Sequence, residues 1–135
     1  MLKETFNNKI ILVTGGTGSF GKKFIEIVLK HHNPKKIICY SRDELKQFDF
    51  KNNIADPKNK LRFFLGDVRD LRRLNQAFEN VDIVVHAAAL KQVVSGEYNP
   101  FEVVQTNIIG TQNVCEAILT SSVKKGVFLS TDKAV

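Results

Sequence analysis

The stretch KIILVTGGTGSFG, residues 9–21, decides the fold of this chain. An apolar run at 9–14 leads directly into Gly15, Gly18 and Gly21, and apolar residues then recur at helical spacing. Glycines let the backbone turn sharply and approach a pyrophosphate, and a helix that begins there presents free N–H groups and its positive dipole end. Any tight turn between a strand and a helix also favours glycine. In this strand–turn–helix context, however, the pattern predicts a dinucleotide-binding turn.

Short β-rich runs alternate with amphipathic segments along the rest of the chain, which is typical of βαβ units and a parallel sheet. We expect strands at residues 9–14, 36–41, 62–65, 83–87 and 127–129, and helices at 19–30, 43–52, 71–78 and 99–121. The last helix should begin at Asn99 and Pro100. One face of it should carry Val104, Ile108, Cys115 and Ile118. The sequence therefore predicts an α/β fold: a doubly wound parallel sheet of Rossmann type, truncated after the fifth strand, in one incomplete NAD(P)-binding domain over residues 1–135.

The composition is that of a soluble globular domain, with 135 residues, 43% hydrophobic and 25% charged. No apolar run approaches the roughly 20 residues that a membrane span needs, and the N-terminus lacks the apolar core of a signal peptide. We therefore expect no membrane association and a cytoplasmic location. Cys39 and Cys115 lie in apolar stretches, so both are expected as buried small hydrophobic residues. The histidines are too scattered to predict a metal site.

The net charge of +6 is unevenly distributed along the chain. Residues 1–60 hold twelve basic and six acidic side chains, whereas residues 61–135 hold eight of each. The surplus thus falls in the half that contains the glycine-rich turn, where a positive field attracts anionic dinucleotides and sugar nucleotides. A nucleic-acid groove usually interleaves aromatic residues with Lys and Arg, and no such stripe is present. Nucleic acid is therefore not an expected partner.

The end of the second expected strand bears on which dinucleotide binds. Ser41 lies 20 residues past Gly21 (41 − 21), where a carboxylate on the ribose 2′-hydroxyl would indicate NAD. The sequence offers Ser41 and Arg42, a hydroxyl and a guanidinium that suit a 2′-phosphate. Asp43 keeps NAD open, because one residue of misalignment would put an acid at that place. The sequence favours NADP, and Lys46 is a further candidate for its site.

Other candidates follow the remaining strands at their carboxyl ends, the ligand side of an open α/β sheet. Asp67 could accept from the adenine amino group, with the Val68 N–H facing the ring, or Asp67 could cap the next turn. Small residues follow the fourth strand, and His86 before them reads as a packed strand-end residue. The predicted cofactor-binding residues are Gly15, Thr17, Gly18, Ser19, Phe20, Gly21, Ser41, Arg42, Asp43, Lys46, Asp67, Val68, Ala87, Ala88 and Lys91.

A hydroxyl, an acid and a base follow the fifth expected strand together, at Thr131, Asp132 and Lys133. Their place at the carboxyl end of a strand, where a nicotinamide should lie, favours a catalytic role over an ordinary polar loop.

These motifs together resemble the extended short-chain dehydrogenase/reductase family. Within it they look most like the inverting UDP-N-acetylglucosamine 4,6-dehydratases of flagellin-sugar and capsule biosynthesis. The matching stretches are VTGGTGSFGKKF (13–24), YSRDELKQ (40–47), GDVRD (66–70), HAAALKQV (86–93), EYNPFE (97–102), TNIIGTQNV (106–114) and LSTDKA (129–134). The last is the most specific, because Thr-Asp-Lys is typical of the inverting type whereas retaining dehydratases carry Thr-Asp-Glu.

The resemblance implies a role for each matching residue. Oxidised NADP would take a hydride from C4 of the hexose, Lys133 would remove the C5 proton, and Asp132 would protonate the departing C6 hydroxyl. Thr131 would hydrogen-bond the C4 oxygen, and Asn107 would brace the active-site strand. The resemblance also implies a UDP-N-acetylglucosamine substrate and a homo-oligomer for the full-length protein.

Some features depart from that pattern. Val94 stands where these enzymes commonly have proline, and the Tyr-x-x-x-Lys motif of the family would lie beyond Val135. We therefore expect the 135-residue chain alone to be inactive. Two alternatives stay open: a related NADP-dependent sugar-nucleotide epimerase or reductase, and a nucleotide-binding protein without activity.

Overall fold

A single five-stranded parallel sheet forms the centre of the molecule, with the strand order β3-β2-β1-β4-β5. The computed structural model describes residues 5–88 and 100–129, and over 100–106 only the backbone. The strands are β1 (Ile10–Thr14), β2 (Lys36–Ser41), β3 (Leu61–Leu65), β4 (Ile83–His86) and β5 (Lys125–Phe128). The helices are α2 (Ser19–His31), α3 (Glu44–Asn53), α4 (Leu71–Ala77) and α5 (Pro100–Leu119). The predicted Rossmann-type α/β fold is confirmed.

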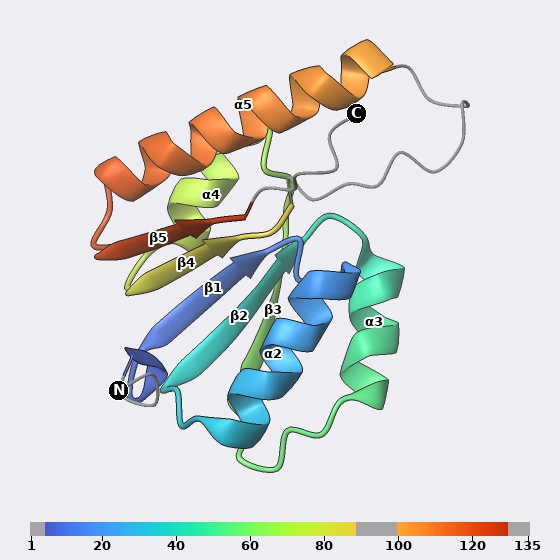
Figure 1. Ribbon diagram of the computed structural model, residues 1–135, viewed down its shortest axis with the longest axis vertical. Coiled ribbons are helices and arrows are strands. Elements are labelled where there is room, and N and C mark those ends of the chain that lie inside the picture. Colours follow the sequence, from blue (N-terminus) through green and yellow to red (C-terminus); the bar gives the residue numbers. More distant parts are fainter. Residues whose placement is uncertain (1–4, 89–99, 130–135) are drawn as a thin grey trace.

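The helices lie on both faces of the sheet, as a doubly wound fold requires (Figure 1). Helices α2 and α3 cover one face, and α4 and α5 cover the other. The order of the strands reverses at β1, which pairs with β2 on one side and with β4 on the other. Crevices for ligands form at such a switch point, outside the carboxyl ends of the strands.

Each face of the sheet has its own hydrophobic core. The core beneath α2 and α3 contains Ile11, Val13, Ile25, Val28, Ile37, Cys39, Phe50, Leu61, Ile83, Val85 and Ala87. The core beneath α4 and α5 contains Leu12, Tyr40, Leu74, Ala77, Phe78, Val81, Val84, Val114 and Ala117. Central strands buried on both faces explain why β1 and β4 read as continuous apolar runs rather than alternating ones.

The apolar face that the spacing predicts for α5 is buried only in part. Ile118 packs against the core, whereas Ile108 and Cys115 are exposed, and Gly110, Val114 and Ala117 are buried. Helix α5 is apolar around much of its circumference, so spacing alone does not identify the face that packs inward. The inward face carries small residues, because they let the helix approach its neighbours closely. The expectation that both cysteines are buried is therefore correct for Cys39 and wrong for Cys115.

The start of β5 also differs from the sequence prediction. The strand begins at Lys125, not at residue 127, and Gly126 pairs with Val84 of β4. A Cβ on Gly126 would lie 2.8 Å from Cδ1 of Ile118. The glycine thus keeps its strand pairing and makes room for a side chain of α5.

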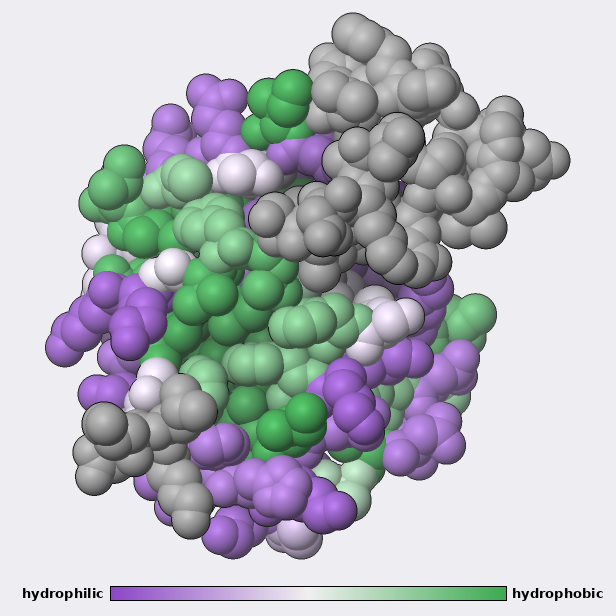
Figure 2. Space-filling view, in the orientation of Figure 1, coloured by the Kyte–Doolittle hydropathy of each residue, from purple (hydrophilic) through white to green (hydrophobic). Residues whose placement is uncertain are grey.

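On the face of the sheet that carries α2, hydrophobic residues gather over β4 and β5, beside that helix (Figure 2). Val127 and Phe128 of β5 are among the exposed large hydrophobic residues. Within the described residues no helix is long and apolar enough to cross a membrane. In the same part of the chain, no cluster of three or more His, Cys, Asp or Glu side chains is placed to hold a metal ion.

Candidate functional site

A cavity of about 270 Å³ opens at the carboxyl ends of β1, β2, β3 and β4, at the switch point of the sheet. Its lining residues are Gly15, Thr17, Gly18, Tyr40, Ser41, Arg42, Asp43, Lys46, Gly66, Asp67, Val68, His86, Ala87, Ala88, Asn107 and Gly110. Eleven of the fifteen predicted cofactor-binding residues are among them. The cavity therefore brings together segments that are far apart in sequence, as the motif pattern predicted.

The glycine-rich turn forms the floor of the cavity beside β4. Gly15 has φ of +65°, and a Cβ there would lie 2.8 Å from the backbone N and Cα atoms of Ala88. A side chain at residue 15 would thus be strained and would collide with the backbone of the neighbouring loop. A Cβ on Gly21 would collide with the Gly15 carbonyl oxygen. Gly21 therefore serves the packing of α2 against the turn and does not line the cavity.

The N-terminus of α2 has no side-chain cap. Its N-cap is Gly18, a lining residue of the cavity, and no side chain there accepts from the helix. The starts of α3 and α4 differ, because Asp43 and Asp70 accept from the N–H groups of Lys46 and Arg73. A helix N-terminus left without a carboxylate cap and opening on a cavity suits an anionic group. Ser19 and Phe20 begin this helix without being lining residues, and their cofactor role stays a prediction.

Two basic side chains line the cavity after β2: Arg42 follows the strand directly, and Lys46 lies in the first turn of α3. The Asp43 carboxylate accepts from the Lys46 N–H at 3.0 Å, so it is engaged as the cap of α3. Ser41 is buried, and its hydroxyl oxygen accepts from Nε2 of Gln47 at 2.9 Å. The Arg42 side chain is half exposed, and its Nη1 lies 3.6 Å from a carboxylate oxygen of Asp67.

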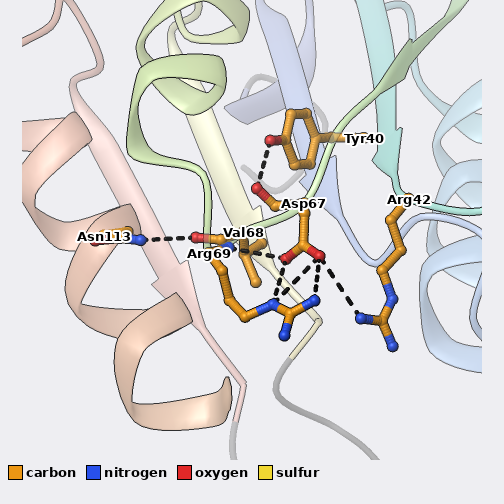
Figure 3. Close-up of polar contacts among 6 residues, drawn as sticks. All are labelled: Tyr40, Arg42, Asp67, Val68, Arg69 and Asn113. Atoms are coloured by element: carbon orange, nitrogen blue, oxygen red, sulfur yellow. Dashed lines mark hydrogen bonds and ion pairs between the residues drawn. The ribbon is translucent and has the colours of Figure 1, made fainter. Parts of the chain in front are cut away.

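Two side chains from other elements hold the backbone of the loop after β3, one from each side (Figure 3). The Tyr40 hydroxyl donates to the Asp67 carbonyl at 2.9 Å, and Nδ2 of Asn113 donates to the Val68 carbonyl at 3.0 Å. A Cβ on Gly110 would lie 2.7 Å from Cγ2 of Val68, so this residue of α5 must stay small. The loop therefore has a fixed backbone where Asp67 and Val68 line the cavity.

The Asp67 side chain is engaged by arginine. Its carboxylate accepts from the backbone N–H of Arg69 at 2.9 Å and from Nη2 of the same residue at 2.8 Å, and Nη1 of Arg42 lies 3.6 Å away. The hydrogen bonds from Arg69 are the main reason that the pKa of Asp67 is lowered to about 2. The structure thus confirms the capping alternative for Asp67, while Asp67 also lines the cavity where the adenine was expected.

His86 at the end of β4 is buried, as predicted for a packed strand-end residue. Its ring lies between the hydroxyl of Thr14 on β1 and the hydroxyl of Thr111 on α5. Burial lowers the pKa of His86 to about 4, so the ring is neutral at physiological pH. This neutral ring fixes the end of β4, from which Ala87 and Ala88 reach the cavity.

Other sequence-predicted residues lie outside the described residues, namely Lys91, Thr131, Asp132 and Lys133. Their roles stay predictions. The lining residues that sequence reasoning did not assign to the cofactor site are Tyr40, Gly66, His86, Asn107 and Gly110. A glycine inside a helix such as Gly110 marks a close approach of two elements, but the sequence does not say which residue approaches it.

Comparison with known proteins bears on the family. The family described as "Polysaccharide biosynthesis protein" matches residues 11–135. An inverting UDP-N-acetylglucosamine 4,6-dehydratase from Campylobacter jejuni (strain 81-176) is 54% identical over 129 residues, which are 96% of this chain and 38% of that protein. A UDP-glucose 4-epimerase from Rickettsia akari is 44% identical over 133 residues, 96% of this chain and 38% of that protein. The solved structure of Pen from Bacillus thuringiensis matches with a TM-score of 0.86 at 44% identity, covering 96% of this chain and 41% of Pen.

These similarities span nearly all of the chain, but the chain spans only 38% of the length of the two curated relatives. The resemblance to the inverting dehydratases is confirmed by a relative that shares more than half of the aligned residues. Since the family match covers residues 11–135 and the fold agrees with a solved relative, the chain belongs to this polysaccharide biosynthesis protein family.

Proposed function

We propose that the complete protein containing this sequence converts UDP-N-acetylglucosamine by 4,6-dehydration with inversion at C5, with NADP as its cofactor, in nucleotide-sugar biosynthesis for surface glycans or flagellin. The observation that carries the proposal is the 54% identity to an inverting dehydratase over 96% of the chain. The cavity at the switch point of the sheet supports it, because this is where open α/β folds bind their ligands.

The residues of the cavity fit a dinucleotide. The start of α2 has no side-chain cap and its N-cap Gly18 lines the cavity, which suits a pyrophosphate. Arg42 and Lys46 would bind the 2′-phosphate that distinguishes NADP from NAD. The Asp43 carboxylate is committed to capping α3, which weakens the case for NAD.

The proposed chemistry divides between cofactor and protein. When bound, NADP would supply a hydride acceptor for C4 of the hexose and, once reduced, a hydride donor for C6. Lys133 would remove the proton from C5, Asp132 would give a proton to the departing C6 hydroxyl, and Thr131 would orient the C4 oxygen. A proton from the opposite face would then return to C5, which gives the inversion. These three roles rest on the resemblance of residues 129–134. A lysine that loses its proton near neutral pH in a desolvated site is chemically suited to act as the base.

A second candidate is 4-epimerisation of a UDP-sugar, favoured by the 44% identity to a UDP-glucose 4-epimerase. The sequence Thr131-Asp132-Lys133 argues for dehydration instead, because epimerisation returns the hydride to C4 and needs no acid at C6.

We further propose that the complete protein works in the cytoplasm as a homo-oligomer.

Mass spectrometry of the sugar nucleotide separates these candidates. The purified complete protein is incubated with UDP-N-acetylglucosamine and NADP in deuterated water. Dehydration predicts a product lighter by one water that carries deuterium at C5, whereas epimerisation predicts an isomer of unchanged composition. No change of the substrate under saturating cofactor would contradict both enzymatic proposals and leave nucleotide binding without turnover.

A further inference from the structure

Charged side chains of both signs meet at one end of the cavity, after β2 and β3. Arg42 and Lys46 are the cations that line it, and Asp43 and Asp67 are the carboxylates. Taken alone, these four charges cancel. A cavity end with no net charge would not favour a ligand that carries an additional phosphate over one that does not.

Arg69 changes this balance without being a lining residue. Its guanidinium donates to both oxygens of Asp67, with Nε 3.2 Å from Oδ1 and 3.3 Å from Oδ2 and Nη2 2.8 Å from Oδ2 (Figure 3). The same carboxylate accepts the backbone N–H of Arg69. Such a two-pronged arginine–carboxylate pair is among the stronger polar contacts in proteins.

Arg42 approaches Asp67 from the opposite side of this pair (Figure 3). Its Nη1 lies 3.6 Å from Oδ2, which is longer than a hydrogen bond, and its side chain is 53% exposed. Since Arg69 already supplies the close partner of Asp67, Arg42 keeps donors for a ligand. With Arg69 included, the cations around this end exceed the carboxylates by one.

We propose that Arg69 is a specificity-determining residue of the cofactor site, which acts by neutralising Asp67 so that Arg42 can bind a 2′-phosphate. This inference rests on the proposed use of NADP and deepens it. Without Arg69, the Asp67 carboxylate would draw Arg42 into a closer ion pair and would repel the phosphate. The adenosine part that NADP and NAD share would feel a much smaller effect, because it carries no charge.

The test measures the affinity of the complete protein for NADP and for NAD by calorimetry, and uses their ratio. Effects on the shared part of the two cofactors cancel in this ratio. We expect Arg69→Gln to lower the preference for NADP by roughly three- to tenfold, the size of one added charge interaction at a solvated site. High salt should reduce the difference. Arg69→Lys keeps the charge but loses the two-pronged contact, so its preference for NADP should lie between those of the wild type and Arg69→Gln.

The double variant Asp67→Asn/Arg69→Gln gives the decisive result. It removes the carboxylate together with its partner, so the preference for NADP should return to about the wild-type ratio. If Arg69 bound the phosphate directly, the double variant would stay as impaired as Arg69→Gln, and that outcome would overturn the inference. Arg72→Gln is the matched control, since it removes the same charge from an exposed residue of α4 outside the cavity lining.

The outcomes also separate this inference from the proposed function. A wild-type protein that binds NAD as tightly as NADP would contradict the proposed cofactor, and with it the role of Arg69. A wild-type preference for NADP that survives Arg69→Gln unchanged, with native circular dichroism, would overturn the role of Arg69 alone.

Discussion

The hydroxyl oxygen of Thr14 lies 2.7 Å from Nδ1 of His86, and this contact fixes the tautomer of the buried ring. The same oxygen accepts the backbone N–H groups of Ala87 at 3.1 Å and Ala88 at 3.4 Å. A hydroxyl has two acceptor sites and one proton, so its proton goes to Nδ1 of His86. The ring proton is therefore on Nε2, where it can be donated to the Thr111 hydroxyl at 3.3 Å.

The first prediction is that the free energy of unfolding decreases as the pH is lowered, because of His86. The pKa of His86 is about 4 in the folded state and about 6.5 when unfolded, so the unfolded state binds the proton first. Stability is thus complete above pH 6.5 and is lost progressively as the pH falls toward 4. Between pH 7 and pH 5 the loss should be about 2 kcal/mol, measured by urea unfolding.

Two variants check the source of that loss. His86→Gln should be less stable at pH 7 but should flatten the dependence between pH 7 and pH 5. His31→Gln removes an exposed histidine of α2 and should leave the dependence as it is. A wild-type protein with constant stability over this range would show that His86 titrates normally. Nitrogen NMR at neutral pH should in addition find the proton on Nε2.

The second prediction concerns the Thr14 hydroxyl. Thr14→Val keeps the shape of the side chain but leaves the N–H groups of Ala87 and Ala88 without this acceptor. The Ala87 N–H keeps a second acceptor in the Thr14 carbonyl at 3.1 Å, so the main losses fall on Ala88 and His86. We expect a loss of about 1–3 kcal/mol, the cost of buried polar groups without partners.

Thr14→Ser retains the hydroxyl and is the matched control for that variant. It should lose only the small contribution of the missing methyl group, about 1 kcal/mol or less. Because Ala87 and Ala88 line the cavity, Thr14→Val should also weaken dinucleotide binding, measured by calorimetry. If Thr14→Val and Thr14→Ser were equally stable, the Thr14 hydroxyl would not contribute to the stability of this site.

The third prediction concerns the two side chains that hold the loop after β3. Tyr40→Phe removes the hydrogen bond to the Asp67 carbonyl but retains the ring, which stacks on Phe64. Asn113→Leu removes the bond to the Val68 carbonyl from the opposite side. Each should cost about 1 kcal/mol in urea unfolding and lower the affinity for NADP and NAD equally. A selective effect on NADP would instead place these residues near the 2′-phosphate.

Much of this architecture could be predicted from the sequence because it depends on local pattern. The turn at Gly15 and Gly18 lies between a strand and a helix that adjoin it in sequence, and the lining residues at the ends of β2 and β3 follow from strand position. Gly110 and Tyr40 could not be assigned to the site. Their roles come from contacts with Val68 and Asp67, which lie 42 and 27 residues away in sequence (110 − 68 and 67 − 40).

The same distinction explains the error in α5. Hydrophobic spacing identified the helix and placed Ile108 and Cys115 on the same face as Ile118, but only Ile118 of these three packs against the core, beside the buried Val114 and Ala117. The inner face is set by how closely the helix approaches the sheet and the loop after β3, and that distance is a property of the packed molecule. The small residues at 110 and 117 indicate the closely packed face of α5 better than its large apolar residues do.

The fourth prediction uses the two cysteines. Cys39 is fully buried, and burial raises its pKa to about 12, whereas Cys115 is exposed on α5. The thiolate is the reactive form, so a thiol reagent at pH 8 should modify Cys115 quickly and Cys39 only on unfolding. Peptide mass spectrometry of the native protein should find the label on Cys115 and not on Cys39, and Cys115→Ser should remove the label from that peptide. Rapid labelling of Cys39 in the folded protein would contradict its burial.

The last prediction separates two glycines of the same turn. At Gly15, φ is +65° and a Cβ would lie 2.8 Å from the backbone of Ala88, so Gly15→Ala faces both strain and a collision with backbone atoms. At Gly18, the nearest atom to a Cβ is the Gly15 carbonyl oxygen at 3.3 Å, and the backbone is extended. We expect Gly15→Ala to destabilise the protein by about 2 kcal/mol or more. Gly18→Ala should cost about 1 kcal/mol or less.

Gly18→Ala, which should affect stability less, should nevertheless affect cofactor binding strongly, because Gly18 lines the cavity at the start of α2. Its added methyl group would occupy space that a pyrophosphate needs against the helix N-terminus, so Gly18→Ala should stay folded and still lose most of its affinity for both NADP and NAD. Thermal unfolding and calorimetry on the two variants measure these effects separately. If Gly18→Ala bound both cofactors as the wild type does, the turn would be structural only, and the dinucleotide would have to bind elsewhere in the cavity.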